Sequence, residues 1–215
     1  MINLIKINLF KRISTLIVFV PLILYSVYAG GLTLAIFFII LLSIITYEIS
    51  NMLETSKNIL LPYLYLAISI ISLYMFIFLV LTEYVSFYLF IKVILIIWMF
   101  DTFCYLGGSI LKGRKLYPKV SSGKTISGLF TGIIFTITFT LIYSILFKEQ
   151  IISNIIISVL IISLSFFGDT LASYTKRNAN VKDSGNILPG HGGVIDRMDS
   201  FMLVFLMIGL FFLTK

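Results

Sequence analysis

The sequence predicts an all-α protein, a bundle of helices that crosses a membrane several times. Of its 215 residues, 60% are apolar and 12% are charged, and the mean hydropathy is +1.11. A soluble domain usually has about 45 to 50% apolar and about 25% charged residues, so this chain has more apolar side chains than one water-soluble core can bury. The same composition excludes a disordered chain, and a single cysteine, Cys104, excludes a disulfide scaffold.

Seven apolar runs, bounded by charged residues or by Gly and Pro, are the predicted membrane spans. A span needs about 17 to 25 residues, so the third and fifth runs are long enough, whereas the first, second and last are short. Gly30 and Gly31 separate the first two runs and suit a tight turn, since glycine adopts positive φ without strain. A tilted or re-entrant hairpin is the alternative there. The runs lie near residues 13–28, 32–47, 59–81, 84–100, 126–147, 151–168 and 200–214.

The basic residues predict the orientation of these spans. Cytoplasmic loops of membrane proteins collect Lys and Arg. With a cytoplasmic N-terminus, the inner segments hold 13 of the 16 basic residues, the outer segments hold Lys148 and Lys215, and Lys92 lies inside a span. We expect Lys92 to extend its ammonium group towards the outer surface. An eighth span or a broken helix would change this topology in the C-terminal half.

Polar residues concentrate in two predicted cytoplasmic loops, residues 101–125 and 169–199. These loops hold five of the nine carboxylates and nine of the 16 basic residues. We expect one membrane domain, 1–215, with N-terminal helical spans in 1–97 and a catalytic half in 98–215. An ionisable group at a membrane boundary is costly unless it is paired, hydrated or bound to a metal. Four aspartates predicted at this face are therefore candidates for function: Asp101 and Asp169, which end the fourth and sixth predicted spans, and Asp196 and Asp199, which open the seventh.

The second loop has the composition of a segment that binds phosphate and a metal. Glycines such as Gly192 and Gly193 allow the backbone and its N–H groups to approach a ligand closely. Asp196 and Asp199 are three residues apart, so on a helix they share one face. Carboxylates, with a single histidine in the chain, favour Mg²⁺ over zinc.

This loop resembles the signature of the phosphatidate cytidylyltransferases, also called CDP-diacylglycerol synthases. Their pattern, S-x-x-K-R-x4-K-D-x-G-x2-L-P-x-H-G-G-x2-D-R-x-D, is matched at every fixed position from Ser173 to Asp199. Upstream, Gly168-Asp169 resembles the G-D pair of that family, and residues 101–108 and 118–128 resemble its D-x-x-A-Y-x-x-G and S-P-K-K-T-x-E-G segments. The chain departs from the family pattern at Cys104, Ser122, Gly123, Ser127 and Ala172.

The resemblance implies an enzyme that converts CTP and phosphatidic acid into CDP-diacylglycerol and pyrophosphate. It implies a bacterial cytoplasmic (inner) membrane, a site facing the cytoplasm, and Mg²⁺, with a second cation such as K⁺ as an option. As metal ligands it implies Asp169 and Asp196 first, followed by Asp199 and Asp101. It implies catalytic roles for Asp169, Asp196, Lys176, Arg197 and His191, and substrate binding by Ser121, Lys124, Thr125, Arg177, Lys182, Asp183, Gly192 and Gly193.

The charge of the substrates predicts how such a reaction is catalysed. A phosphate monoester has a second pKa near 6 and is mostly dianionic at neutral pH, so phosphatidate needs no strong base. The difficulty is to bring two anions together, which calls for in-line positioning and neutralisation of charge. Membrane lipids are expected partners and nucleic acid is not. A homodimer is left open by Gly128-x-x-x-Gly132, a pattern that allows close helix packing.

Other interpretations remain open for the candidate residues and for the function. Asp169 could cap a helix or pair with Lys176, and Asp196 could cap a helix. Asp101 could be an interfacial anchor, Asp199 could pair with Arg197, and His191 could be structural. The alternative functions are a related CTP-dependent enzyme that acts on another lipid phosphate or a lipid alcohol, and an anion transporter. A transporter predicts charges along a path through the bilayer, where the sequence places only Lys92.

Overall fold

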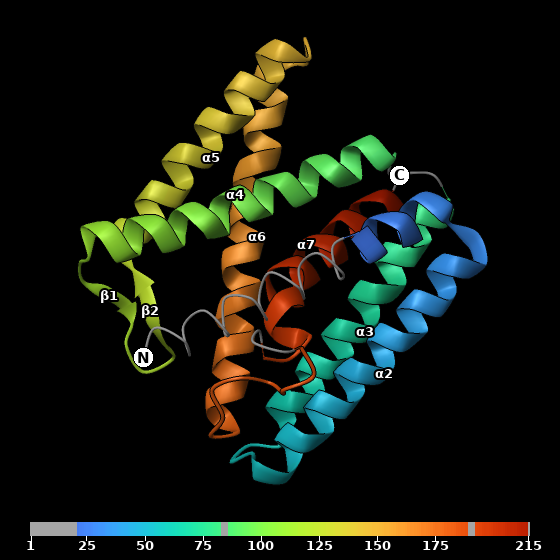
Figure 1. The fold of residues 1–215 in the computed structure, drawn as a ribbon, viewed down its shortest axis with the longest axis vertical. Helices are drawn as coiled ribbons and strands as arrows, with labels where there is room; N and C mark the ends of the chain where they lie inside the picture. Colours follow the sequence, from blue (N-terminus) through green and yellow to red (C-terminus); the bar gives the residue numbers. More distant parts are fainter. Residues whose placement is uncertain (1–20, 83–85, 189–191, 215) are drawn as a thin grey trace, which may run out of the picture.

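Long apolar helices and one short β-hairpin make up the computed structural model, which describes residues 21–82, 86–188 and 192–214 (Figure 1). Residues 21–29 are helical. The remaining elements, in chain order, are α2 (Gly31–Thr55), α3 (Leu60–Leu81), α4 (Phe87–Leu111), β1 (Lys115–Tyr117), β2 (Ser121–Thr125), α5 (Ile126–Leu146), α6 (Ile151–Asn178) and α7 (Ile195–Leu213).

Five of these helices, α2 to α6, are long and apolar enough to cross a membrane by length and composition. The all-α, polytopic fold class is therefore confirmed. The first predicted span begins outside the described residues, and residues 21–29 are its described part. The seventh run corresponds to α7, whose start carries Asp196, Arg197 and Asp199. That α7 crosses the membrane, and that the N-terminus is cytoplasmic, stay predictions.

The helices α4 and α6 are longer than hydropathy predicts. α4 continues to Leu111 and α6 to Asn178, so the first part of each predicted loop is helical. Asp101 and Asp169 lie inside helices, and the expectation that they end them is wrong. Hydropathy falls where polar residues begin, but these turns still pack on neighbouring helices, as the burial of Lys176 shows. Their backbone therefore keeps its helical hydrogen bonds.

The β-hairpin also lies where a loop was expected. β1 and β2 pair antiparallel, with Lys115 opposite Thr125 and Tyr117 opposite Ser121. Thr125 then caps α5 because its hydroxyl accepts a hydrogen bond from the Gly128 N–H at 3.1 Å. The hairpin therefore holds the residues before α5 against the end of α4 (Figure 1).

Close packing of α4 on α5 explains the Gly-x-x-x-Gly pattern. A Cβ atom added to Gly132 would lie 2.3 Å from Cys104 Sγ, and one on Gly128 would lie 2.5 Å from the carbonyl oxygen of the same residue. Both glycines are buried against α4 within the chain. The pattern is thus used for packing inside one molecule and offers no support for a homodimer, which stays untested.

Lys92 of α4 is buried, and its ammonium group is directed to the turn between α5 and α6, which the basic residues predict to be on the outer side. It is 7% exposed, forms an ion pair with Glu149 in the turn before α6, and donates a hydrogen bond to Asn154 Oδ1 at 2.8 Å. The hydrogen bond from Lys92 lowers the pKa of Glu149. The ammonium group therefore extends towards the predicted outer end of the bundle, as expected, but it ends on the carboxylate of Glu149 and not in water.

We expect the Lys92→Met variant to be less stable than the natural protein by about 2 kcal/mol. Removing one partner of a buried ion pair costs about 3 to 5 kcal/mol. We expect a smaller loss here, because the side chain of Glu149 is 25% exposed and water partly stabilises its remaining charge. Thermal unfolding in detergent measures the change. Lys148→Met, at an exposed lysine of the same turn, is the matched control and should leave the midpoint unchanged. Equal midpoints for both variants would contradict this account.

Candidate active site

The four aspartates singled out by the sequence come from three helices that meet at one end of the bundle. Asp101 lies on α4, Asp169 on α6, and Asp196 and Asp199 on the first turns of α7. Ser200 joins two of these helices, because its hydroxyl donates to Asp101 Oδ2 at 3.1 Å. The structure therefore brings together carboxylates that are up to 98 residues apart in the chain.

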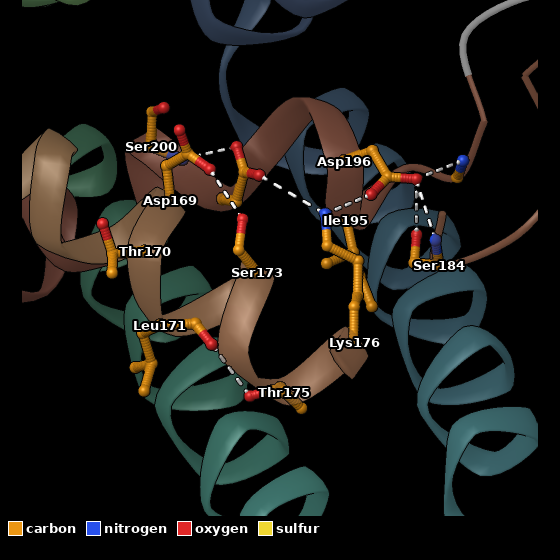
Figure 2. A network of polar contacts seen from close by, with 12 residues as sticks. Asp169, Thr170, Leu171, Ser173, Thr175, Lys176, Ser184, Ile195, Asp196 and Ser200 are labelled. Atoms are coloured by element: carbon orange, nitrogen blue, oxygen red, sulfur yellow. Dashed lines mark hydrogen bonds and ion pairs between the residues drawn. The ribbon is translucent and has the colours of Figure 1, made fainter. Parts of the chain in front are cut away.

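Gly168 explains why α6 and α7 can approach each other beside Asp169. A Cβ atom at Gly168 would lie 2.5 Å from the carbonyl oxygen of Asp199. Any side chain there would push the two helices apart. Asp169 follows directly, and its Oδ1 accepts a hydrogen bond from Ser173 Oγ at 3.3 Å, one turn further along α6 (Figure 2). In the Gly-Asp pair, the glycine thus allows α6 and α7 to pack closely, and the aspartate places a carboxylate next to this contact.

Two lysines supply the positive charge next to these carboxylates. Lys176 Nζ lies 2.6 Å from Asp196 Oδ1 and 4.0 Å from Asp199 Oδ2, and Figure 2 shows Lys176 and Asp196 facing each other. Lys124 Nζ lies 3.0 Å from Asp169 Oδ2. The side chain of Lys176 is 11% exposed, so its charge is poorly screened by water.

Asp196 is held in place by the glycine-rich loop before α7. Its Oδ2 accepts hydrogen bonds from the N–H groups of Ser184 and Gly193, both at 2.9 Å (Figure 2). Burial opposes ionisation of this carboxyl, but the charge and hydrogen bond of Lys176, together with the two N–H donors, lower its pKa below the ordinary value. Gly192 has a positive φ of 89°, and a Cβ atom there would lie 2.8 Å from Asp196 Oδ2. The backbone of the glycine-rich loop, which was expected to approach a ligand, therefore lies against the carboxylate of Asp196.

The residues expected to bind substrate divide into two groups. Lys124 and Thr125 lie in the cluster: Lys124 donates to Thr170 Oγ1 at 2.9 Å, and Thr125 caps α5. Ser121 is half-buried at the start of β2. In contrast, Lys182 and Asp183 are exposed on the loop before α7.

Arg177 has a structural role in this arrangement. Its Nε donates to the carbonyl oxygen of Val120 at 3.1 Å, and its Nη1 donates to that of Val181 at 2.7 Å. The guanidinium thus ties the hairpin turn to the loop after α6. Binding of substrate by Arg177 stays a prediction, as does a role for His191, which lies outside the described residues.

A largely apolar cavity of about 730 Å³ reaches the carboxylates. Asp101, Asp196, Asp199 and Ser200 lie along its polar part, and exposed Arg197 also lines it. Apolar residues from 21–29, α2, α3, α4 and α7 form the rest of its wall, among them Leu24, Phe37, Phe38, Leu41, Phe76, Phe90, Ile94, Trp98 and Phe205. A second cavity, of about 40 Å³, shares Asp101 and is lined by Lys124, Thr125 and Asp169.

Comparison with known proteins assigns the chain to a family. The sequence model of the Cytidylyltransferase family matches residues 57–214, a segment that contains all four aspartates and both lysines. The chain belongs to the cytidylyltransferase family. The family expected from the signature is thereby confirmed.

Similar proteins with a curated name agree with this assignment. A phosphatidate cytidylyltransferase of Rickettsia felis is 35% identical over 207 residues, which cover 92% of this chain and 89% of the relative. Those of Rickettsia conorii and Staphylococcus epidermidis are 41% and 42% identical over 121 and 113 residues. In these last two alignments the chain spans about half of the relative, 53% and 43% of its length.

The donor atoms of the candidate site fit a hard cation such as Mg²⁺, because they are carboxylate oxygens. Asp101, Asp169 and Asp199 would hold it where Lys124 gives way from Asp169, and Asp196 would join them where Lys176 gives way. In residues 21–82, 86–188 and 192–214, however, no three Asp, Glu, His or Cys side chains converge as a metal site does. The ammonium groups of the two lysines lie against the carboxylates instead. Metal binding therefore stays a prediction.

Three residues of the site were not singled out from the sequence. Ser184 and Ser200 are polar residues of the signature loop and of α7 that match no fixed position of the pattern. Glu48 lies one residue beyond a predicted span, and its only signal was that of an ionisable residue at the end of an apolar run. Its contacts are described below.

Proposed function

We propose that this cytidylyltransferase forms CDP-diacylglycerol and pyrophosphate from CTP and phosphatidate. The single observation that supports this most strongly is the cavity that is apolar along its walls and reaches Asp101, Asp199 and Ser200. Such a cavity fits a substrate with acyl chains and a charged head group. The names of the relatives, phosphatidate cytidylyltransferase, point to the same lipid.

The charges of the site support a role for a divalent cation. Four aspartates face two lysines, so phosphate groups that enter would meet more carboxyl groups than cations and would be repelled. A bound Mg²⁺ would neutralise the phosphate oxygens and orient them for in-line transfer. We propose Asp169, Asp101 and Asp199 as the residues that hold it.

The residues of the chain would then align the two substrates. An oxygen of the phosphatidate phosphate attacks the α-phosphorus of CTP, a new P–O bond forms, and the bond to the β-phosphate oxygen breaks to release pyrophosphate. Lys176 and Lys124 stabilise the negative charge that develops on the oxygens. Lys124 and Thr125 precede α5, and the N-terminus of a helix favours phosphate.

We propose that the site faces the cytoplasm of a bacterial cell, since 13 of the 16 basic residues fall in segments predicted on that side. CTP would reach the site from the cytoplasm and phosphatidate from the membrane.

The proposed reaction is tested with detergent-purified protein, Mg²⁺, radiolabelled CTP and phosphatidate, each omitted in turn. We expect labelled liponucleotide and pyrophosphate only when all three are present. Product with another lipid phosphate or a lipid alcohol, but none with phosphatidate, would support the alternative enzyme. A folded protein that gives no product with any of these lipids would overturn the proposal.

A substitution that narrows the cavity should weaken lipid binding. We expect Ile94→Trp to raise the KM for long-chain phosphatidate by about tenfold, while the KM for CTP changes little. A misfit of one methylene group in an apolar pocket changes binding by about this factor. Ile94 is buried and lines the cavity. Ile71→Trp, on the exposed face of α3, is the matched control. Steady-state kinetics with both substrates varied measures the effect, and an unchanged lipid KM would place the acyl chains elsewhere.

A further inference from the structure

A fully buried carboxylate on α2 holds the start of α7. Glu48 is 0% exposed. Its Oε1 accepts a hydrogen bond from the Val194 N–H at 2.7 Å, and its Oε2 accepts one from the Ile195 N–H at 3.0 Å and one from Ser184 Oγ at 2.7 Å. The first N–H groups of a helix have no partner within it, and a negative charge there is favourable. Glu48 satisfies two of them from another helix.

Two glycines of the signature loop make room for this carboxylate. A Cβ atom on Gly193 would lie 2.5 and 2.6 Å from the Glu48 carboxylate oxygens and 2.0 Å from Ser184 Oγ. A Cβ atom on Gly185 would lie 3.0 Å from Glu48 Oε1. The loop thus packs its backbone directly onto Glu48, and the absence of side chains at these two positions is explained by a residue far away in the sequence.

Contacts at the end of α2 fix the position of Glu48 relative to α6. The Lys57 N–H donates to the carbonyl oxygen of Asn178 at 3.1 Å, and the Asn58 N–H donates to Asn178 Oδ1 at the same distance. Asn178 in turn donates through Nδ2 to the carbonyl oxygen of Asn58 at 2.7 Å. The turn between α2 and α3 is therefore attached to the last residue of α6, the helix that carries Lys176.

A short chain of hydrogen bonds connects Glu48 to the active site. Ser184 Oγ lies 2.7 Å from Glu48 Oε2 and 3.1 Å from Asp196 Oδ2, and its single hydrogen can serve one of them at a time. The Ser184 N–H donates to the same oxygen of Asp196, whose other oxygen contacts Lys176. A displacement of the loop away from Glu48 would move the donors that orient Asp196.

We infer that Glu48 is a positioning residue of the reaction. Its carboxylate fixes the loop and the start of α7, and through them the placement of Asp196 and Lys176. The inference rests on the proposed function for its catalytic consequence. Glu48 lies outside residues 57–214, the part that the family model matches, so family membership by itself does not assign it this role.

The replacement Glu48→Gln tests the inference with little change in shape. An amide has one acceptor oxygen and an NH₂ group that cannot accept from an N–H, so one of the two bonds to Val194 and Ile195 is lost. Misplacement of catalytic groups by about 1 Å costs about a hundredfold in rate. We expect kcat to fall by about ten- to a hundredfold, the range seen when supporting partners are removed, with the KM of both substrates within about twofold.

The control is Glu54→Gln, the same change at an exposed position of the same helix, which should leave kcat unchanged. Glu48→Asp keeps the charge and should recover part of the lost rate. A positioning role would be overturned by an equal loss of kcat in Glu48→Asp and Glu48→Gln, or by a rise in KM with kcat unchanged. So would a Glu48→Gln enzyme with the natural kcat.

A measurement that needs no activity separates this inference from the proposed function. Hydrogen exchange, read by mass spectrometry on peptides that cover residues 184–198, should be faster in Glu48→Gln than in the natural protein, because the Val194 and Ile195 N–H groups lose protection. If the natural protein makes no CDP-diacylglycerol but exchange is faster in Glu48→Gln, the proposed function is refuted and the structural link stands. Unchanged exchange would refute the link itself.

Should Glu48→Gln fail to fold, Ser184→Ala tests the same connection from its other end. We expect it to lower kcat by several-fold and to raise exchange in the same peptides, since it removes a donor that touches Glu48 and Asp196. Where both single variants fold, the double variant should lose less than the product of the two single losses, because both act on one network. An unchanged kcat in Ser184→Ala, or losses that simply multiply, would overturn the inference.

Discussion

Replacing Asp169 by asparagine is expected to lower kcat by about a thousandfold, the upper range for removal of one group that stabilises a developing charge. Asparagine has the same shape, but it lacks the charge that would hold a divalent cation and that pairs with Lys124 at 3.0 Å. Asp169 is 33% exposed and its partner Lys124 is 16% exposed. A pair so close to water contributes little to stability, about 1 kcal/mol or less, so the variant should stay folded.

The measurement compares kcat, thermal unfolding and Mg²⁺ dependence for the natural protein and Asp169→Asn. We expect nearly equal unfolding midpoints together with the large loss of rate. Glu54→Gln removes a carboxylate at an exposed site and serves as the control for a change in net charge. Retention of more than a tenth of the natural kcat in Asp169→Asn would show that this carboxylate neither binds the cation nor orients a substrate.

Lys176→Met should affect both activity and stability. Lys176 is the ammonium group between Asp196 and Asp199, whose side chains are 9% and 11% exposed. Methionine fills the space but leaves two buried carboxylates without this neutralising charge. Breaking a buried ion pair costs about 3 to 5 kcal/mol, and we expect a loss of kcat of about a hundredfold or more from the missing positive charge.

Thermal unfolding in detergent and the liponucleotide assay measure these two effects. Lys57→Met is the matched control, because the side chain of Lys57 is exposed and only its backbone contacts Asn178. It should keep both the midpoint and the rate. A Lys176→Met protein with the natural midpoint would mean that Asp196 and Asp199 do not need the charge of this lysine, because a buried carboxyl can take up a proton instead.

The sequence predicted the membrane helices well and their ends poorly. The apolar runs near 59–81, 126–147 and 151–168 correspond to α3, α5 and the first part of α6. Apolar character records which residues face lipid or the core, and it stops being informative where a helix passes into polar surroundings. Asp101 and Asp169 were therefore expected at helix ends, although both helices continue for several turns.

The roles of individual charged residues were only partly predictable. Asp169 and Asp196 were expected to act together, and the structure brings both into one cluster. That Lys176 contacts Asp196 while Lys124 contacts Asp169 could not be read from spacing, because residues 20 or 45 positions apart meet only through the packing of helices. The partner of Lys92 was not predictable for the same reason, since Glu149 belongs to a turn between two other helices.

The sequence by itself determined the fold class, the family and the identity of the carboxylates, because composition and a signature of fixed residues are local properties of the chain. Tertiary structure alone decided which lysine neutralises which aspartate, where the apolar cavity meets the acids, and that Glu48 of α2 supports the start of α7. A buried charge takes whatever partner the folded chain brings within hydrogen-bonding distance. That distance depends on how the helices pack and cannot be predicted from the spacing of the residues in the sequence.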